Sequence, residues 1–258
     1  MTAPERAASA VGPGLWRLGR LGLHIVHGVL IVRLRFGHLA CAEQHAHIAG
    51  WAQGVLRLLR IDVRTQGALL PGPKLIVANH VSWLDIVVIH AVCPQARFVS
   101  KAVVRHWPLI GKLVTGAGTL MVDRHQRRDT ARVLDAMVQS LNQGDTVALF
   151  AEGTTSDGAQ VLDFRSSLLQ SAVVAKVAVQ PIALRYSEAG HARSPSVPYI
   201  GTTSFVESLW RICVARDLIV TIRMLGAVAP PHSDRRTLAR ALHSGIAAAL
   251  GDGMQSEA

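Results

Sequence analysis

The sequence predicts an α/β fold, in which helices cover a mixed, largely parallel sheet and a membrane-associating helical segment comes first. Two observations predict the α/β part: short apolar runs alternate with longer amphipathic segments, and turn residues separate them. A third observation predicts the N-terminal segment, because residues 15–36 form a long apolar stretch with arginines at its flanks.

The N-terminal region divides into a tail and an anchor. Residues 1–14 are rich in Ala, Pro and Gly, and we expect them to be disordered. Residues 15–60 are expected to form an apolar and amphipathic helical membrane anchor, with a second helix over about 42–60. The uncharged core of the first helix, Leu21 to Val32, is shorter than the ~20 residues that a spanning helix needs. This favours a monotopic anchor over a single span, and both stay open.

Residues 61–258 have a length that suits one α/β domain. Each expected strand is a short apolar run, and the expected helices repeat apolar residues at helical spacing. The first helix of the domain begins at a capping box, Ser82-x-x-Asp85, and Gly144 stops the second. Pro181 lies near the start of the fifth strand, where its missing N–H does least harm. The expected elements are strand 75–79, helix 82–90, strands 97–100 and 119–123, helix 129–142, strand 146–150, helix 167–177, strands 179–185 and 218–224, and a final helix capped by Ser233.

The segment NHVSWLD, Asn79 to Asp85, places a histidine five residues before an aspartate, directly after the first strand. Residues five apart do not share a helix face, so we expect His80 just before the helix, folded back toward Asp85. Such a pair is a candidate general base, because the imidazole can take a proton from a hydroxyl while the carboxylate fixes its tautomer. The alternative is structural: Ser82 and Asp85 cap the helix and His80 is merely packed or solvated.

Other strand ends also carry polar or conformationally special residues. Arg124 follows one expected strand, and Glu152, Gly153 and Thr154 follow another. In open α/β sheets, sites assemble at the edge where parallel strands end. Taken singly, each has an ordinary explanation, since Arg124 can end a strand in solvent and Glu-Gly is a common turn pair.

With these segments in this order, the chain resembles the 1-acylglycerol-3-phosphate acyltransferase family, the glycerolipid acyltransferases with an H-x-x-x-x-D signature. The resemblance covers roughly residues 50–230, and its four blocks are specific only together. It implies that residues 61–258 are a catalytic domain in which His80 is the general base and Asp85 orients it. It further implies acceptor-binding roles for Arg124, Glu152, Gly153, Thr154, Lys101 and Arg165, and structural or acyl-donor-side roles for Asn79, Gly118 and Pro181.

The resemblance implies transfer of a fatty acyl group from a thioester of acyl carrier protein or coenzyme A to the free hydroxyl of a lysolipid. The first expected acceptor is 1-acyl-sn-glycerol-3-phosphate, acylated at its sn-2 hydroxyl to give phosphatidic acid. The third block departs from the usual F-P-E-G-T-R-S, with Ala151 in place of proline and Thr155 in place of arginine. Thr155 cannot grip a phosphate as an arginine does. The segment therefore also resembles the branch that acylates lyso-ornithine lipid, which stays an alternative.

The composition favours a membrane over nucleic acid as the partner. The chain carries a net charge of +10, half of its residues are hydrophobic, and its mean hydropathy is +0.29. A basic and apolar chain suits an anionic lipid surface. Aromatic residues are only 5%, and the sequence contains no motif for nucleic-acid recognition. We expect the protein at the cytoplasmic face of the inner membrane.

The remaining expectations concern cofactors and partners. The three cysteines have no paired spacing and the histidines form no metal-ligand pattern, so we expect no disulfide framework, no metal and no cofactor. The thioester is a co-substrate, and the sequence does not give the oligomeric state. Two readings from other classes stay open: a non-catalytic lipid-binding scaffold, against which intact His80 and Asp85 argue, and a binder of anionic polymers.

Overall fold

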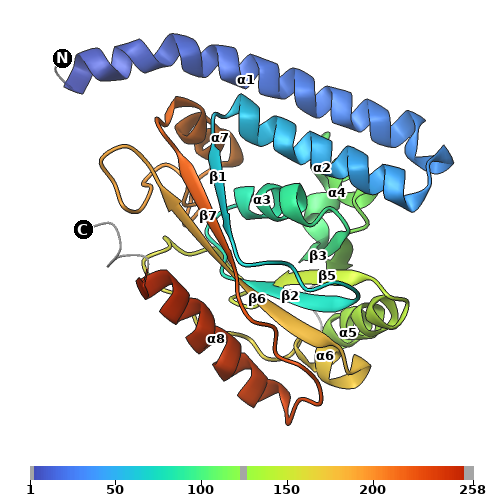
Figure 1. Cartoon of the computed structure of the whole chain (residues 1–258). Coiled ribbons are helices and arrows are strands. Elements are labelled where there is room, and N and C mark those ends of the chain that lie inside the picture. The colour runs from blue at the N-terminus through green and yellow to red at the C-terminus, as the bar shows by residue number, and fades with distance from the viewer. Residues whose placement is uncertain (1–2, 123–126, 253–258) are drawn as a thin grey trace.

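The computed structural model describes residues 3–122 and 127–252. Within them, one sheet contains strands in the order β1-β7-β6-β2-β5-β3-β4 (Figure 1). Neighbours are parallel except β6 and β7, so the predicted mixed, largely parallel sheet is confirmed. The strands are β1 Asp62–Gln66, β2 Lys74–Ala78, β3 Ala96–Lys101, β4 Leu120–Val122, β5 Thr146–Phe150, β6 Ala178–Ser187 and β7 Ile219–Met224.

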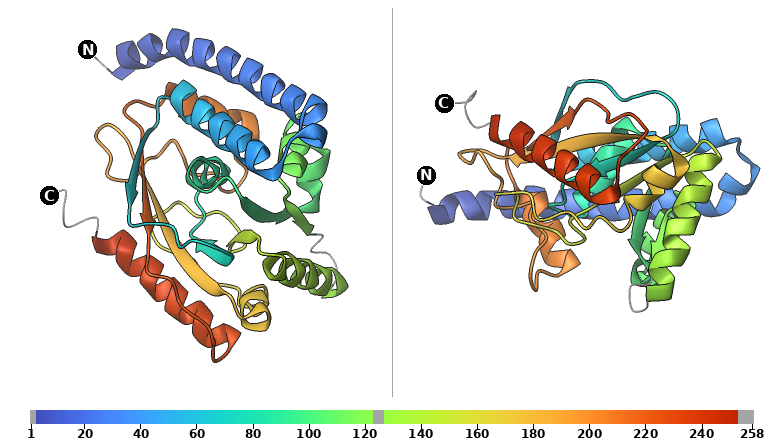
Figure 2. Two further views of the ribbon diagram at one scale, coloured as in Figure 1. Left: turned by 45° about the vertical axis from the view of Figure 1, so that its right-hand side comes forward. Right: turned by 90° about the horizontal axis from the view of Figure 1, so that it is seen from below.

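Helices cover both faces of the sheet (Figures 1 and 2). In the central strand β2, Ile76 and Ala78 join the core beneath α1, α2, α3 and α7, and Leu75 and Val77 join the core beneath α5, α6 and α8. This two-sided burial explains why β2 is a continuous apolar run. The helices are α1 Ala3–Leu34, α2 Cys41–Leu58, α3 Leu84–Val92, α4 Ile110–Gly116, α5 Arg127–Asn142, α6 Gln170–Ala175, α7 Phe205–Val214 and α8 Arg235–Asp252, with 3-10 helices η1 Phe36–His38 and η2 Ala102–His106.

The N-terminal segment differs from its prediction. Residues 3–14 were expected to be disordered, but α1 begins at Ala3 and continues to Leu34. Alanine has the highest helix propensity. Pro4 lies in the first turn of α1, where a backbone N–H would have no partner within the helix, so its missing N–H costs little. Together with η1, the segment from Val11 to His38 is long and apolar enough to cross a membrane, and only 17% of its most apolar window is buried.

The helix α1 is nevertheless attached to the domain. The guanidinium of Arg17 donates to the carbonyls of Cys213 and Ala215, at 2.8 and 3.2 Å, where α7 ends. Farther along, His24 Nε2 donates to the Trp51 carbonyl at 2.9 Å, and Trp51 Nε1 donates to the His24 carbonyl at 3.2 Å. These reciprocal bonds join α1 to α2, so the two helices form one hairpin above α3 (Figure 1).

The hairpin depends on glycines at its contact points. A Cβ on Gly28 would lie 2.4 Å from Trp51 Nε1, and one on Gly54 would lie 2.6 Å from the His24 ring. A side chain at either position would force the helices apart, because such contacts lie well inside van der Waals separation.

Several other elements differ from the expected ones. The strand β1 and the helices α4 and α7 were not predicted. Ser204 caps α7 by accepting from the Glu207 N–H, a signal that was overlooked in the sequence. The final helix is capped by Asp234 rather than Ser233: Asp234 Oδ1 accepts from the N–H groups of Arg236 and Thr237 at 2.7 and 3.1 Å.

Candidate active site

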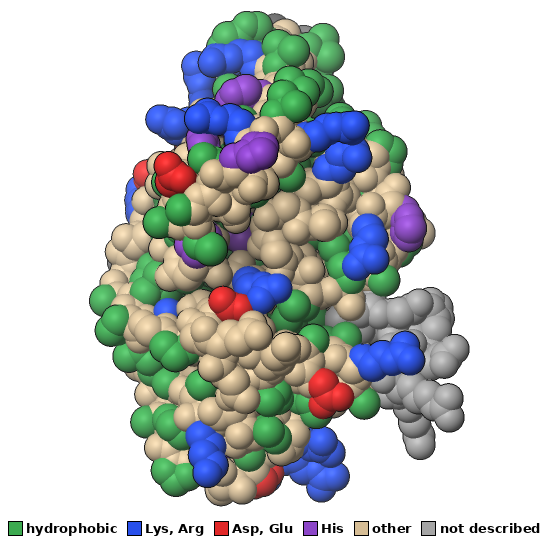
Figure 3. All heavy atoms as spheres, turned by 90° about the vertical axis from the view of Figure 1, so that its right-hand side faces the viewer, with side chains coloured by type: hydrophobic (Ala, Val, Ile, Leu, Met, Phe, Trp, Pro, Cys, Tyr) green, Lys and Arg blue, Asp and Glu red, His purple; other side chains and the backbone are tan. Residues whose placement is uncertain are grey.

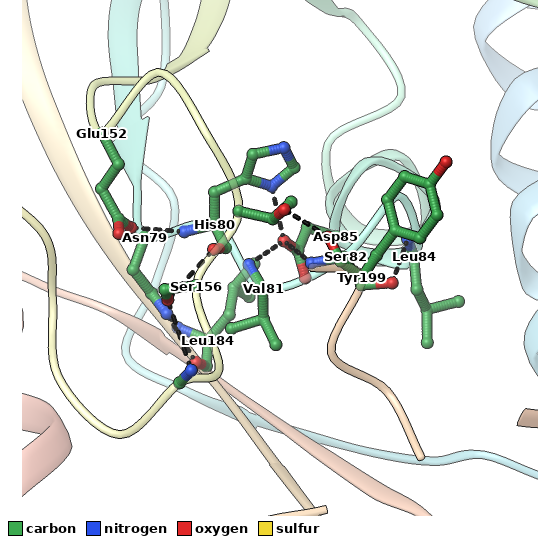
Figure 4. A network of polar contacts seen from close by, with 12 residues as sticks. Asn79, His80, Val81, Ser82, Leu84, Asp85, Glu152, Ser156, Leu184 and Tyr199 are labelled. Atoms are coloured by element: carbon green, nitrogen blue, oxygen red, sulfur yellow. Dashed lines mark hydrogen bonds and ion pairs between the residues drawn. The ribbon is translucent and has the colours of Figure 1, made fainter. Parts of the chain in front are cut away.

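His80 and Asp85 meet where β2 ends and α3 begins. His80 lies two residues after β2 and Asp85 lies in the first turn of α3, so the intervening turn folds the imidazole back as the spacing predicts. His80 Nδ1 lies 2.8 Å from Asp85 Oδ2 (Figure 4). Since a carboxylate only accepts, Nδ1 carries the proton and Nε2 is left as the basic nitrogen.

Asp85 is fully buried and its oxygens are held from several sides. Its Oδ2 also accepts from the N–H groups of Val81 and Ser82, at 2.7 and 2.9 Å (Figure 4). The structural and functional interpretations of this motif therefore hold together, because one carboxylate both binds the turn and orients His80. Ser82 has a smaller part than expected, since its hydroxyl accepts only a 3.4 Å contact from the Leu84 N–H.

The second oxygen of Asp85 is held by Tyr186 of β6. The Tyr186 hydroxyl donates to Asp85 Oδ1 at 2.7 Å. Burial raises the pKa of Tyr186 well above its ordinary value, and the neighbouring carboxylate raises it further, so the hydroxyl stays protonated as a donor. Tyr186, Asp85 and His80 thus form a continuous chain of hydrogen bonds from the sheet to the imidazole.

Glu152 holds the backbone of the same turn. One of its oxygens accepts from the His80 N–H at 2.7 Å and the other from the Leu162 N–H at 3.0 Å. The resemblance implied an acceptor contact, but the carboxylate is only 3% exposed and is occupied by these two donors. Burial raises the pKa of Glu152, against the two hydrogen bonds that lower it. In this structure, Glu152 therefore helps to position His80 through its backbone N–H.

Two further contacts fix the turn on either side of His80. The Asn79 side chain forms a pair of hydrogen bonds with the backbone of Leu184 in β6, at 3.0 and 2.8 Å (Figure 4). The His80 carbonyl accepts from the Ser156 N–H at 2.8 Å. The structural role expected for Asn79 agrees with this geometry, since its amide continues the pairing of β2 with β6 beyond the last strand residue.

One face of the His80 ring packs on an aromatic ring beside a large cavity. The Phe150 ring stacks on the imidazole with centroids 3.9 Å apart and planes 7° apart. His80 lines a cavity of about 470 Å³. The other walls are mainly aliphatic and aromatic side chains, which come from α1, α2, α3, η2, α4, α7 and the ends of β3 and β5. An apolar chamber thus opens beside the basic nitrogen.

The expected cationic residues are not all placed. Lys101, at the end of β3, is exposed and lines the cavity. Arg165 is exposed, and its backbone N–H donates to the Ala151 carbonyl at 2.8 Å, next to Glu152. Arg124 lies outside the described residues.

The remaining predicted residues differ in their relation to the cavity. Gly153 and Thr154 line it, following β5. Gly118 adopts a φ of +70°, which favours glycine, and its carbonyl accepts from Arg97 Nε at 3.0 Å. Pro181 lies inside β6 opposite Val77 and is not among the residues that line the cavity.

Three site residues were missed in the sequence. Phe150 and Tyr186 each lie near a strand end, and a buried aromatic residue with a polar tip was the available signal for Tyr186. Tyr199 lines the cavity, and its carbonyl accepts from the Thr155 hydroxyl. Because they come from separate segments, no local spacing joins them to His80.

Among the described residues, no group of three or more His, Cys, Asp or Glu side chains is placed to hold a metal ion. The polar groups beside His80 are bound to protein partners instead. Buried oxygens of Asp85 and Glu152 accept from the backbone, His80 and Tyr186. What the site offers is a histidine base, oriented by a carboxylate, at one wall of an apolar chamber.

Known proteins resemble this chain in sequence and in fold. A family model described as acyltransferase matches residues 60–185. A lyso-ornithine lipid O-acyltransferase of Pseudomonas aeruginosa is 36% identical over 200 residues, 78% of this chain and 76% of that protein. A 1-acyl-sn-glycerol-3-phosphate acyltransferase of Neisseria meningitidis is 35% identical over 78% of this chain and 79% of that protein.

A crystal structure of the 1-acyl-sn-glycerophosphate acyltransferase PlsC from Thermotoga maritima has the same fold. Its TM-score is 0.75 at 20% identity, and the match covers 96% of this chain and 97% of that one. The sequence relatives and the placement of His80 beside Asp85 point to one conclusion: this chain is a member of the acyltransferase family.

Proposed function

We propose that this chain transfers a fatty acyl group from a thioester to the free hydroxyl of a lysolipid. The observation that carries the proposal is the His80–Asp85 contact of 2.8 Å, which leaves Nε2 of His80 as a base beside the apolar cavity. A general base and an apolar chamber are what acyl transfer between two lipid chains needs. Relatives with both kinds of acceptor in their names support the lysolipid class.

In the proposed reaction, Nε2 of His80 takes the proton of the acceptor hydroxyl as its oxygen attacks the thioester carbonyl. Asp85 steadies the imidazolium that forms, and Tyr186 and the backbone N–H groups keep the carboxylate in place. The tetrahedral intermediate then collapses, the C–S bond breaks and the thiolate takes up the proton. The ester oxygen is the acceptor's own, so no acyl-enzyme is required.

For the acceptor, we propose 1-acyl-sn-glycerol-3-phosphate, whose phosphate would meet two exposed cations: Lys101, which lines the cavity, and Arg165, whose backbone N–H binds the Ala151 carbonyl beside Glu152. A second candidate is lyso-ornithine lipid. It is favoured by Thr155, which stands where an arginine is usual and whose hydroxyl donates to the Tyr199 carbonyl. A threonine held in this way offers no cation to a phosphate.

The protein associates with membranes, and we propose that α1 lies on the cytoplasmic surface of the inner membrane. Its outward side exposes Leu15, Trp16, Leu23, Leu30 and Leu34, each at least 49% accessible. Exposed Arg33 and Arg35 follow at its C-terminal end, so apolar and basic groups lie together, as they do on the upper part of the face in Figure 3. The hydrogen bonds of α1 to α2 and α7 favour a helix lying along the domain over a separate span.

The test is acyl transfer by purified protein in detergent. Lysophosphatidic acid and lyso-ornithine lipid are offered side by side, each with an acyl carrier protein and a coenzyme A thioester. His80→Ala should lower turnover by about 10²–10⁴-fold. The matched control is His191→Ala, which removes an exposed histidine that does not line the cavity.

Turnover of lysophosphatidic acid would support the first acceptor, and turnover of lyso-ornithine lipid alone would support the second. A His80→Ala protein as active as His191→Ala would contradict the mechanism. If the wild-type protein binds lysolipid but transfers no acyl group to either acceptor, the scaffold alternative replaces the proposal.

A further inference from the structure

The segment 101–112, from the last residue of β3 through η2 into α4, has an outward side that takes no part in the reaction described above. Several of its side chains line the cavity, but Arg105, Leu109 and Lys112 do not. All three are exposed, so they face away from the cavity. We refer to these three residues as the η2–α4 patch.

The members of the patch lie close together. The Lys112 N–H donates to the Leu109 carbonyl at 3.1 Å, and residues three apart are neighbours on a helix surface. Gly111 brings Arg105 to the same place, because the Arg105 carbonyl oxygen lies where a side chain at position 111 would begin. The patch is therefore an exposed apolar side chain beside two cations.

The backbone at Leu109 is strained. Its φ is +60° and its ψ is −54°, and the Ile110 N–H donates to the Pro108 carbonyl at 2.6 Å. This is the rare form of the γ-turn, whose positive φ glycine adopts readily and leucine does not. The leucine also leaves 43% of its surface exposed. Strain of this kind gathers at binding and catalytic sites, so a strained, exposed leucine points to a partner that covers it.

The charge around the patch indicates the kind of partner that it fits. The chain has no Asp or Glu in residues 86–122, which contain the patch, and none in residues 6–42, which contain most of α1. No acidic side chain from either segment offsets the two cations. Apolar and basic groups together suit the interface of an anionic bilayer, where cations meet headgroups and an apolar group enters below them.

The patch also lies next to the helix that we place on the membrane. The helix α4 packs along α1: a Cβ on Gly28 would lie 3.1 Å from Leu113 Cδ2, and one on Gly116 would lie 2.5 Å from Val32 Cγ1 (Figure 1). Leu113 directly follows the patch, so the patch adjoins this stretch of α1. One bilayer surface can then contact both elements.

We propose that the η2–α4 patch is a second membrane contact, separate from α1. Arg105 and Lys112 bind the headgroups of anionic lipids, and Leu109 enters the interface beside them. Because the other side of the segment lines the cavity, this contact holds the cavity wall against the surface from which a lysolipid comes. The role in lysolipid access rests on the proposed function, whereas the contact itself does not.

The first test measures binding of the full-length protein to phosphatidylglycerol–phosphatidylcholine vesicles by co-sedimentation. Each basic residue at an anionic surface contributes about 1 kcal/mol, so Arg105→Gln with Lys112→Gln should lower the affinity by about 10–30-fold. The matched control is Arg235→Gln with Arg236→Gln, which removes the same charge from exposed positions on α8, on the opposite face of the sheet. This control should stay within about threefold of wild type, because charges away from the bilayer are screened by salt.

The second test concerns Leu109. Leu109→Gly removes the side chain and suits the positive φ, so it should keep the melting temperature and lower vesicle affinity about fivefold. For a direct readout, Leu109→Cys is labelled with an environment-sensitive dye after Cys41→Ser removes the exposed thiol, since Cys93 and Cys213 are buried. The dye emission should shift to shorter wavelength when anionic vesicles are added. The same dye at Val174→Cys, on α6, should not shift.

Equal vesicle affinities of the two charge variants, or a dye at position 109 whose emission does not shift, would overturn the inference. So would a charge variant of the patch that binds vesicles normally but loses affinity for an acidic acyl carrier protein, because the patch would then dock a protein. None of these measurements needs turnover, so they stay decisive even if the protein transfers no acyl group.

Discussion

Around His80, buried polar side chains form a polar corner in which they are bound to one another and to the backbone. The hairpin of α1 and α2 above the cavity instead combines close packing at glycines with a single reciprocal pair of hydrogen bonds, between His24 and Trp51. In the polar corner, Asp85 and Glu152 together accept from four backbone N–H groups, and Asp85 accepts as well from His80 Nδ1 and the Tyr186 hydroxyl. In the hairpin, the decisive contacts are Gly28 on Trp51 and Gly54 on His24. The polar corner fixes the position of His80 Nε2, and the hairpin encloses the apolar cavity beside it, which has space for an acyl chain.

This difference has a physical cause. Buried hydrogen bonds are directional and costly to leave unmade, so they determine a single geometry. Apolar packing is non-directional and depends on volume, so it can enclose a chamber that accepts different chains. Changes in the corner should therefore affect catalysis together with stability, and changes in the hairpin should affect mainly stability and membrane attachment.

The largest effect is expected from Asp85→Asn. The amide cannot replace a carboxylate that accepts from Val81, Ser82 and His80 at once, so His80 loses its orientation and the turn loses acceptors. We expect kcat to fall by more than about 10²-fold and the melting temperature to fall as well. Steady-state kinetics and circular dichroism measure the two effects. Full activity would mean that His80 needs no orientation by Asp85.

The hairpin is tested by Gly28→Ala against Gly22→Ala on the same helix. A Cβ at Gly28 overlaps the Trp51 indole, whereas nothing lies within 4 Å of a Cβ at Gly22. We expect Gly28→Ala to destabilise the protein by about 1–3 kcal/mol. Gly22→Ala should stabilise it slightly through helix propensity. Thermal unfolding in detergent measures both, and equal melting temperatures would contradict the close contact of α1 with α2.

A pH-dependent effect is expected at Glu152. Burial holds its folded-state pKa above the ordinary 4.5, so the unfolded chain loses this proton at lower pH than the folded protein does. The contribution of this group to stability is therefore present below about pH 4.5 and falls as the pH rises toward the folded-state pKa. Glu152→Gln should lack this decline and lower stability by about 1–3 kcal/mol, since an amide replaces one acceptor by a donor. Unfolding curves measured across this pH interval compare the two proteins.

A smaller catalytic effect is expected from Tyr186→Phe. Loss of the 2.7 Å hydrogen bond leaves Asp85 Oδ1 without its donor, so the carboxylate orients His80 less strictly. We expect kcat to fall about tenfold with little change in KM, because orientation of the base matters for the chemical step. A purely structural role would lower the melting temperature and leave kcat where it was.

The smallest effect is expected at the membrane surface. Leu23 is 73% exposed on α1, and Leu23→Ser should weaken binding to anionic vesicles several-fold, or about 1 kcal/mol. The matched control is Val174→Ser, which changes an exposed residue on α6, on the opposite face of the sheet. Co-sedimentation with vesicles measures the difference, and equal binding of both variants would place the membrane elsewhere.

Much of the fold was predictable because strands and helices have local periodicity. The apolar run of β2, the amphipathic pattern of α5 and the position of β5 all come from contiguous residues. The short polar strand β1 was missed because its residues are mostly exposed at the sheet edge and carry no apolar pattern. The N-terminal residues 3–14 were misjudged because proline and glycine outweighed alanine in the prediction.

Within the candidate site, the sequence by itself determined the pair His80–Asp85, since five residues and a helix start bring them together. Only the tertiary structure decided their surroundings. Tyr186 lies 101 residues after Asp85 in the sequence, and Glu152 lies 72 residues after His80. Both reach the turn because β6 and β5 flank β2 in the sheet. Strand order is set by how apolar faces pack together across the whole chain, and that is information no single segment contains.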